Sequence, residues 1–209
     1  MPEKAKFLDD LAARRLVAIV RGRDADAALR TVVTLVEEGV HLVEVSLVTS
    51  GALAVIRRAR AALGDAAGLG AGTVISADDA RRAADAGAGY LVTPAVGEGV
   101  AEGARLGLPV LAGALTPTEV VAALDAGAAA IKLFPVWSLG GVRYLKALRD
   151  PFPRVPFVPV GGVGVPEAGE YLRAGAVAVG VGSPLVGDAA DGGSIDELKA
   201  RIAAFKQAL

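Results

Sequence analysis

Short aliphatic runs alternate along the chain with longer stretches in which alanine, arginine and other helix-favouring residues predominate. Five of these longer stretches end at a glycine, and an aliphatic run begins within a few residues of it. The five glycines are Gly39, Gly87, Gly107, Gly127 and Gly175. Because glycine readily adopts the left-handed conformation that ends a helix, the pattern predicts helices that stop at these positions and strands that begin just after them.

The aliphatic runs predict eight strands, each followed by a helical segment. They cover residues 17–20, 42–45, 69–71, 90–92, 109–111, 130–131, 157–160 and 177–179. Strands that are apolar on both faces are typical of a parallel sheet covered by helices. We therefore predict an α/β fold, a (β/α)₈ TIM barrel with an N-terminal helix, with about 26 residues in each βα unit. An open, doubly wound sheet is the alternative.

Sequence signals for helix ends support this assignment of strands and helices. Thr116–Glu119 and Ser194–Glu197 have the spacing of capping boxes, and Pro117 occupies the first helical position of the former. The last helix carries apolar residues at helical spacing, which predicts a stripe that faces the core. The stripe consists of Ile195, Leu198, Ile202 and Phe205.

Composition narrows the class of protein. No linker-like stretch divides the 209 residues, so we expect one domain spanning residues 1–209. Net charge is −1 with both signs interspersed, which argues against binding to nucleic acid or to an anionic membrane. The first fifteen residues are too charged for a signal peptide, and no run of about 18 apolar residues follows. We expect a cytoplasmic protein.

Residue types also limit the chemistry. The chain has no cysteine and a single histidine, His41, so disulfides, thiol nucleophiles and most transition-metal sites are excluded. His41 precedes a predicted strand and would lie at the wrong end of a barrel for catalysis. The pairs Asp24/Asp26 and Asp78/Asp79 stand at helix starts, where carboxylates complement the helix dipole. We expect neither a metal nor a cofactor.

Lys132 is the most informative residue, since it lies within the apolar segment 128–135. Burial among alkyl groups disfavours the charged form of an amine and makes the neutral, nucleophilic form accessible. Such an amine can form carbinolamines and imines with ketones. The alternative is a lysine that extends to solvent or pairs with a carboxylate.

Glu44 is the second charged residue within a predicted strand. It belongs to strand two and Lys132 to strand six, and interior layers of a barrel draw side chains from alternate strands. The two side chains could therefore meet near the barrel axis. A charge-compensated pair is the structural reading; in the functional reading Lys132 forms an imine and Glu44 transfers the protons.

Glycine-rich turns follow strands seven and eight, the positions where this architecture commonly holds phosphate. They contain Gly161-Gly162 and Gly182-Ser183. We expect Ser183 to be the N-cap of a helix whose free amides favour an anion, although tight turns that merely close the barrel have the same composition. At the same rim, Thr73 and Arg21 are suited to holding a small carboxylate, but Arg21 could equally form a surface ion pair.

The same residues, with Pro94 and Phe134, resemble the 2-keto-3-deoxy-6-phosphogluconate aldolase family over nearly the whole chain. The quoted motifs are Gly70–Thr73, Thr93-Pro94, Lys132–Pro135, Gly161-Gly162 and Gly182-Ser183, together with Glu44. The resemblance implies a cofactor-free, lysine-dependent aldolase, usually trimeric, that cleaves a phosphorylated keto-deoxy sugar acid into pyruvate and glyceraldehyde 3-phosphate.

By position, the resemblance implies Lys132 as the imine-forming nucleophile and Glu44 as the proton shuttle. Around the substrate it places Arg21 and Thr73 at the pyruvyl carboxylate, Gly161, Gly162, Gly182 and Ser183 at phosphate, and Pro94 and Phe134 as pocket lining. Three positions depart from the family pattern, Val48 for arginine, Val160 for threonine and Ala112 for proline. Valine at position 160 is similar to the galactonate-type relatives, so the stereochemistry of the substrate stays open.

Two other functions fit parts of this pattern. A phosphosugar isomerase would need the glycine turns but no imine-forming lysine. A non-catalytic sugar-phosphate-binding protein would keep the pocket and bind without turnover.

Overall fold

Eight parallel strands form a nearly closed barrel at the centre of the computed structural model, which describes residues 3–64 and 68–209. Their order around the barrel is β7-β6-β5-β4-β3-β2-β1-β8. Between β7 and β8, the Val177 amide donates to the Phe157 carbonyl at 3.0 Å and Val160 forms a bridge with Gly180. The strands are β1 Leu16–Val20, β2 Leu42–Ser46, β3 Gly68–Gly72, β4 Tyr90–Val92, β5 Val110–Ala114, β6 Ala130–Leu133, β7 Phe157–Pro159 and β8 Val179–Val181.

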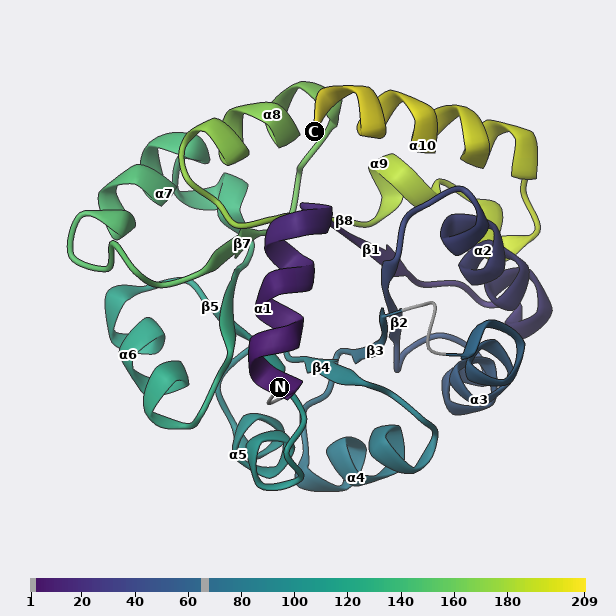
Figure 1. Ribbon diagram of the computed structural model, residues 1–209, viewed down its shortest axis with the longest axis horizontal. Helices are drawn as coiled ribbons and strands as arrows, with labels where there is room; N and C mark the ends of the chain where they lie inside the picture. Colours follow the sequence, from purple (N-terminus) through teal and green to yellow (C-terminus); the bar gives the residue numbers. More distant parts are fainter. Residues whose placement is uncertain (1–2, 65–67) are drawn as a thin grey trace.

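Helices surround the barrel, as Figure 1 shows, and connect each strand to the next parallel one. After α1 (Glu3–Arg14), the helices are α2 Ala25–Glu37, α3 Ala52–Leu63, α4 Ala77–Asp85, α5 Glu98–Arg105, α6 Pro117–Asp125, α7 Val142–Arg149, α8 Val165–Arg173, α9 Ser183–Val186 and α10 Ile195–Ala208, with the 3₁₀ segments η2 Val136–Leu139 and η3 Ala189–Asp191. The predicted TIM barrel with an N-terminal helix is thereby confirmed.

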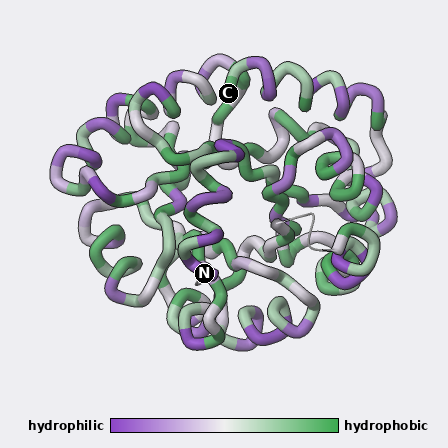
Figure 2. The backbone as a smooth tube through the Cα atoms, in the orientation of Figure 1, coloured by the Kyte–Doolittle hydropathy of each residue, from purple (hydrophilic) through white to green (hydrophobic). Residues whose placement is uncertain are grey.

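Apolar side chains form two layers. Figure 2, which colours the backbone by residue hydropathy, shows hydrophobic residues along the central strands. The larger layer lies between the strands and the surrounding helices, and it includes the α10 side chains of Leu198, Ile202 and Phe205. The smaller fills the barrel interior and includes Val17 and Leu111. Both faces of the strands are therefore buried, which explains why the strands read as continuous aliphatic runs.

Helix α1 closes the amino-terminal end of the barrel. Its Phe7 and Leu11 side chains are buried in the interior layer, and the Phe7 ring lies 4.9 Å from the Tyr90 ring of β4. Lys4 Nζ donates to the Ala128 carbonyl, which precedes β6, at 2.9 Å. Side chains of α1 thus fill the amino-terminal opening of the barrel interior.

The five predicted glycine caps all have positive φ, between 76° at Gly107 and 96° at Gly127. Only β4 matches the sequence-based prediction at both ends. The largest differences are at β5, which runs on to Ala114 rather than to residue 111, and at β8, which spans Val179–Val181 rather than 177–179, whereas β7 ends one residue early at Pro159. Aliphatic residues predict that a strand exists, but its ends depend on which neighbouring strand completes the hydrogen bonds.

The two predicted capping boxes have different outcomes. At Thr116 both reciprocal bonds are present, since Thr116 accepts from the Glu119 amide and Glu119 accepts from the Thr116 amide. At Ser194 the hydroxyl accepts from the Glu197 amide at 3.3 Å, but the Glu197 carboxylate lies 3.5 Å from Arg201 instead of bonding back to residue 194. The second box is therefore only half formed.

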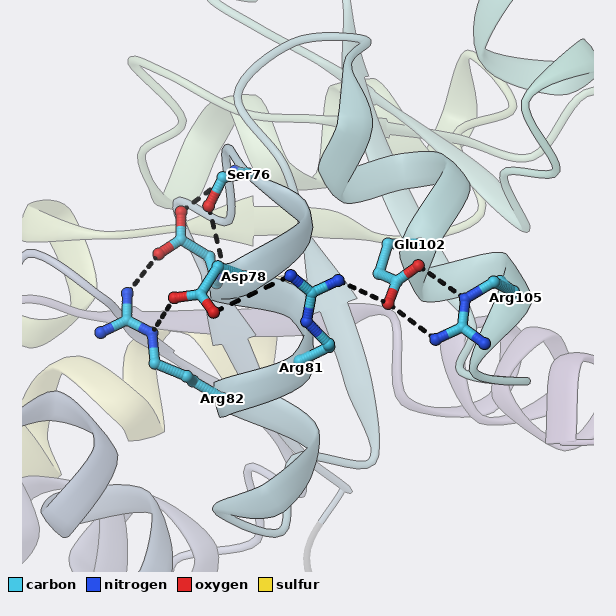
Figure 3. Close-up of polar contacts among 7 residues, drawn as sticks. Ser76, Asp78, Arg81, Arg82, Glu102 and Arg105 are labelled. Atoms are coloured by element: carbon cyan, nitrogen blue, oxygen red, sulfur yellow. Dashed lines mark hydrogen bonds and ion pairs between the residues drawn. The ribbon is translucent and has the colours of Figure 1, made fainter.

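Charged side chains connect the outer faces of α4 and α5 (Figure 3). Glu102 accepts from Arg105 at 2.7 Å and from Arg81 at 3.1 Å. Arg105 and Arg81 hold the pKa of Glu102 at about 2, below the ordinary value of 4.5. Arg81 also lies 3.9 Å from Asp78. The network lies on the outer helices α4 and α5 rather than in the barrel interior.

Among the helices in the described residues, none combines the length and apolar character needed to cross a membrane.

Candidate active site

A cavity of about 350 Å³ opens at the carboxyl end of the barrel. Its lining comes from β1, β6, β8 and α9 and from the loops that follow β1, β3, β4, β6, β7 and β8. Nine of the ten candidate site residues predicted from the sequence lie on the cavity wall, namely Arg21, Thr73, Pro94, Lys132, Phe134, Gly161, Gly162, Gly182 and Ser183. Glu44, the tenth, does not line the cavity and is buried within the barrel.

Lys132 reaches the cavity from β6 and is only 7% exposed. Its Nζ atom lies 5.3 Å from the centroid of the Phe134 ring. Glu44, on β2, is 2% exposed, and burial raises the pKa of its carboxyl group, while the charges of Lys132 and Arg21 oppose that rise. The barrel therefore contains a buried carboxyl group and a buried amine that act on each other electrostatically.

Strand β3 provides the space that Glu44 needs. Its residues alternate between the interior and the helices, and all three interior positions are glycines, Gly68, Gly70 and Gly72. A methyl group at Gly72 would overlap Glu44 Oε1, and one at Gly70 would overlap the ring of Tyr90. The sequence Gly-Leu-Gly-Ala-Gly thus leaves a bare interior wall where side chains of β2 and β4 can lie.

Thr73 lies at the end of β3 with φ +59°, a left-handed conformation that is unfavourable for a β-branched residue. Its Oγ1 atom is 2.7 Å from Ser46 Oγ at the end of β2. Strained residues of this kind persist only where their surroundings hold them, and they cluster at ligand sites. The hydrogen bond fixes the Thr73 hydroxyl at the cavity wall.

The glycine turn after β7 requires glycine at both positions, since Gly161 has φ +98° and Gly162 has φ +65°. The indole of Trp137 packs against it, so that a Cβ at Gly162 would lie 3.2 Å from Trp137 Cδ1. Bare backbone at the cavity wall allows amide groups to approach an anion closely.

The turn after β8 differs from the prediction in one respect. Gly182, rather than Ser183, is the N-cap of α9, because the Leu185 and Val186 amides both donate to the Gly182 carbonyl at 2.9 Å. Ser183 is the first helical residue and Pro184 the second. Ser183 is exposed at the cavity, and its hydroxyl has no hydrogen-bond partner among the described residues, which leaves it available to a ligand.

Arg21 follows β1 and is exposed at the cavity wall. Among the residues that the structure describes, it forms no ion pair, and Arg21 and Lys132 are the only charged side chains on this wall. The cavity therefore combines cationic groups with glycine turns, an arrangement that suits an anionic ligand.

Two polar side chains near the site were not expected from the sequence. Ser46 lies two residues after Glu44, and the two-residue period of a strand could have placed both in the interior. The Tyr90 hydroxyl is buried close to Glu44, and an aromatic residue at the start of an apolar strand gives no such signal. His41, by contrast, lines a separate cavity at the amino end of the barrel.

Within residues 3–64 and 68–209, no cluster of three or more histidine, aspartate or glutamate side chains is arranged to hold a metal ion. The groups on the cavity wall are a buried amine, two hydroxyls, an arginine and exposed backbone, and the buried carboxyl group of Glu44 lies within the barrel. Together they can bind an anion, attack a carbonyl carbon and transfer protons.

The family model for KDPG and KHG aldolases matches residues 8–200. A 2-dehydro-3-deoxy-6-phosphogalactonate aldolase of Escherichia coli K12 is 34% identical over 195 residues, which make up 92% of this chain and 93% of that relative. These matches span nearly all of the barrel and include every residue at the cavity.

Two solved structures are similar in fold as well. A KDPG aldolase from Legionella pneumophila, in which pyruvate is captured as a covalent carbinolamine intermediate, superposes with a TM-score of 0.84 at 27% identity over 99% of this chain and 98% of that one. A designed cube-shaped cage, made by fusing symmetric oligomeric domains, gives a TM-score of 0.86 at 33% identity over 93% of this chain and 71% of that one.

Proposed function

Because the chain belongs to the KDPG and KHG aldolase family, and is thus a carbon–carbon lyase, we propose that it cleaves 2-keto-3-deoxy-6-phospho-sugar acids through an imine on Lys132. The products are pyruvate and glyceraldehyde 3-phosphate. The observation that carries this proposal is the Lys132 amine, buried at the wall of the cavity and acting electrostatically on buried Glu44.

The reaction begins when the neutral amine of Lys132 attacks the keto carbon and forms a carbinolamine. Glu44 protonates the departing hydroxyl, water leaves, and the imine that forms withdraws electrons from the neighbouring carbons. Burial raises the pKa of Glu44, which allows the carboxyl group to carry a proton closer to neutral pH. This property suits a group that must donate and accept protons in turn.

Bond cleavage follows from the imine. The hydroxyl on the carbon beyond the scissile bond loses its proton to a base, its oxygen forms the aldehyde carbonyl, and the bonding electrons move into the imine to give an enamine. After the aldehyde leaves, the enamine carbon is protonated and water hydrolyses the imine, which releases pyruvate and restores the amine. These steps need no external oxidant or reductant.

Binding groups follow from the cavity wall. We propose that Arg21 and Thr73 hold the carboxylate of the substrate, and that Gly161, Gly162, Gly182 and Ser183 hold the phosphate. In this arrangement Pro94 and Phe134 cover the carbon chain. The positive φ angles at Gly161 and Gly162 and the uncommitted Ser183 hydroxyl support the assignment of the phosphate end.

Trapping with borohydride tests the imine. The protein is incubated with pyruvate and borohydride and then mapped by mass spectrometry, and we expect one irreversible pyruvate-derived adduct, on Lys132. Lactate, which lacks the keto group, is the matched control ligand, and exposed Lys146 is an internal control lysine. Cleavage activity without any adduct on Lys132 would refute the mechanism.

A substrate panel tests the activity itself. Pyruvate release is measured from the gluconate and galactonate epimers, from their unphosphorylated analogues and from 4-hydroxy-2-oxoglutarate. We expect turnover of at least one phosphorylated epimer, with Glu44→Gln slowing it by about 100-fold while the fold is kept. Ligand-induced thermal stabilisation without any turnover would instead indicate a sugar-phosphate-binding protein.

We also propose that the chain acts in the cytoplasm as a homotrimer. Large apolar side chains at the carboxyl rim support a covered surface, since Val48 is 62% exposed, Ile75 64% and Trp137 66%. Light scattering coupled to gel filtration should give three times the chain mass of 20.9 kDa. A mass of one chain at micromolar concentration would contradict the trimer.

A further inference from the structure

Tyr90, at the start of β4, carries a polar group that the proposed reaction does not yet use. The residue is 2% exposed, and its hydroxyl has no hydrogen-bond partner among the described residues. The hydroxyl of Tyr144, in contrast, donates to the Leu115 carbonyl on the outside of the barrel. Leaving a buried hydroxyl without a partner costs free energy, so its retention calls for an explanation.

The position of Tyr90 relative to Glu44 follows from strand β3. Gly70 pairs with Glu44 on one side and with Tyr90 on the other. A Cβ at Gly70 would overlap Tyr90 Cζ, the ring carbon that bears the hydroxyl, and a Cβ at Gly72 would overlap Glu44 Oε1. Interior positions two residues apart on a strand are separated by about 7 Å. The hydroxyl and the carboxylate thus occupy neighbouring places over the bare wall of β3.

Charge couples the two groups. Burial raises the pKa of Tyr90 well above its ordinary value, and the Glu44 carboxylate raises it further, so the phenol stays protonated and is available as a donor. The other charges acting on Glu44 are Lys132 and Arg21. The charged or titratable residues lining the amino-end cavity beside Tyr90 are Glu3, Lys6, Asp10, Arg14, His41 and Arg60.

We propose that Tyr90 is a positioning residue for Glu44, whose ionised carboxylate it stabilises by directing its hydroxyl hydrogen toward it. A small rotation of the Glu44 side chain or one bridging water molecule completes the hydrogen bond. This inference rests on the proposed function and deepens it. Burial in the water-free barrel raises the pKa of Glu44 and so favours its protonated form, which cannot accept a proton. The Tyr90 hydroxyl stabilises the ionised form and so offsets part of this rise.

Tyr90→Phe removes only the hydroxyl, and Tyr171→Phe, at a buried tyrosine of α8 outside the barrel interior, is its matched control. The full chain is labelled with ¹³C at the glutamate carboxyl groups and titrated without substrate, and Glu44→Gln identifies the Glu44 signal. We expect the Glu44 midpoint to rise by at least about half a pH unit in Tyr90→Phe and to stay in place in Tyr171→Phe. An unchanged midpoint in Tyr90→Phe would overturn the inference.

Kinetics give a second readout. In Tyr90→Phe, we expect the limb of the pH profile of kcat that reports Glu44 to move to higher pH by the same amount, with KM unchanged. In a Glu44→Gln background, we expect Tyr90→Phe to have no further effect on kcat. A kcat effect of equal size in that background would contradict the inference, because Tyr90 would then act independently of Glu44. Thermal melting checks that each variant is folded.

The two proposals fail in different ways. If no substrate in the panel is cleaved, the proposed function fails, but the carboxyl titration of the unliganded protein still decides the role of Tyr90. If substrate is cleaved through Lys132 and the Glu44 midpoint does not respond to Tyr90→Phe, the function stands and the role of Tyr90 is rejected.

Discussion

The carboxylate of Glu44 lies directly against the backbone of Gly72, so closely that a Cβ at position 72 would overlap its Oε1 atom. Glu44 pairs in register with Gly70, and its side chain leans along the neighbouring strand toward the carboxyl end of the barrel. The absence of a side chain on β3 therefore directs the carboxylate toward the level of the cavity. Glycine is needed there for space, since Gly72 does not have a positive φ.

Gly72→Ala should displace the Glu44 carboxylate and lower kcat by about 100-fold, because a shift of about 1 Å in a catalytic group costs that order of rate. The added methyl also crowds the interior, and overpacking of this kind costs about 1–3 kcal/mol of stability. Gly97→Ala is the control, since its Cβ would meet only the Ile75 carbonyl at 3.9 Å. Steady-state kinetics and thermal melting of both variants give the comparison. If kcat of Gly72→Ala equalled that of the wild type, the position of the Glu44 carboxylate would not depend on the missing side chain at position 72.

Glu44→Gln should change how stability depends on pH. The pKa of Glu44 in the folded protein is raised above its ordinary value of 4.5, so its contribution to stability is fully present below 4.5 and is lost as the pH rises through the folded-state pKa. Glutamine does not ionise, so its contribution to stability does not change over this pH range. The melting temperature of Glu44→Gln minus that of the wild type should therefore increase as the pH rises from 4.5. Melting curves that stay parallel across this range would show that Glu44 is not destabilised by its burial.

Gly162→Ala should weaken the binding of phosphorylated ligands selectively. Gly162 has φ +65°, and a Cβ would press on Trp137 at 3.2 Å, so the substitution distorts the turn proposed to hold phosphate. We expect KM for the phosphorylated substrate to rise by about tenfold, a loss of about 1.4 kcal/mol of binding, with trapping of pyruvate on Lys132 unchanged. Trp137 is the single tryptophan of the chain and reports on this turn by its fluorescence. An equal loss for phosphorylated and unphosphorylated substrates would place the phosphate elsewhere.

Glu102→Gln should lower stability at neutral pH but not in strong acid. The folded-state pKa of Glu102 is about 2, against an ordinary value of 4.5, so its carboxylate stabilises the fold above 4.5 and the effect is lost as the pH falls toward 2. The melting temperatures of variant and wild type should converge over that range, and added salt should narrow the gap at neutral pH. Glu37→Gln is the control, because Glu37 is exposed and forms no ion pair in the part of the chain that the structure describes. If the difference in melting temperature between Glu102→Gln and the wild type did not depend on pH, the ion pairs of Glu102 could not be its cause.

Local patterns were sufficient for the order of elements. Five glycine caps and eight aliphatic runs predicted alternating helices and strands, because a helix end and a strand between two covered faces are each determined by a few consecutive residues. Features that depend on distant partners were less well predicted. The Glu197 carboxylate lies near Arg201 instead of completing a capping box, and α9 begins one residue earlier than expected, because the Leu185 and Val186 amides donate to the Gly182 carbonyl.

The sequence by itself determined the order of strands and helices and selected Lys132 and Glu44, because a charged residue within an apolar strand is recognisable from the sequence alone. Only the tertiary structure decided that these side chains share one interior, that the glycines of β3 leave room for the carboxylate, and that Tyr90 lies beside it. These relationships depend on the register between β2, β3 and β4, which the closing of the barrel sets and no single segment encodes.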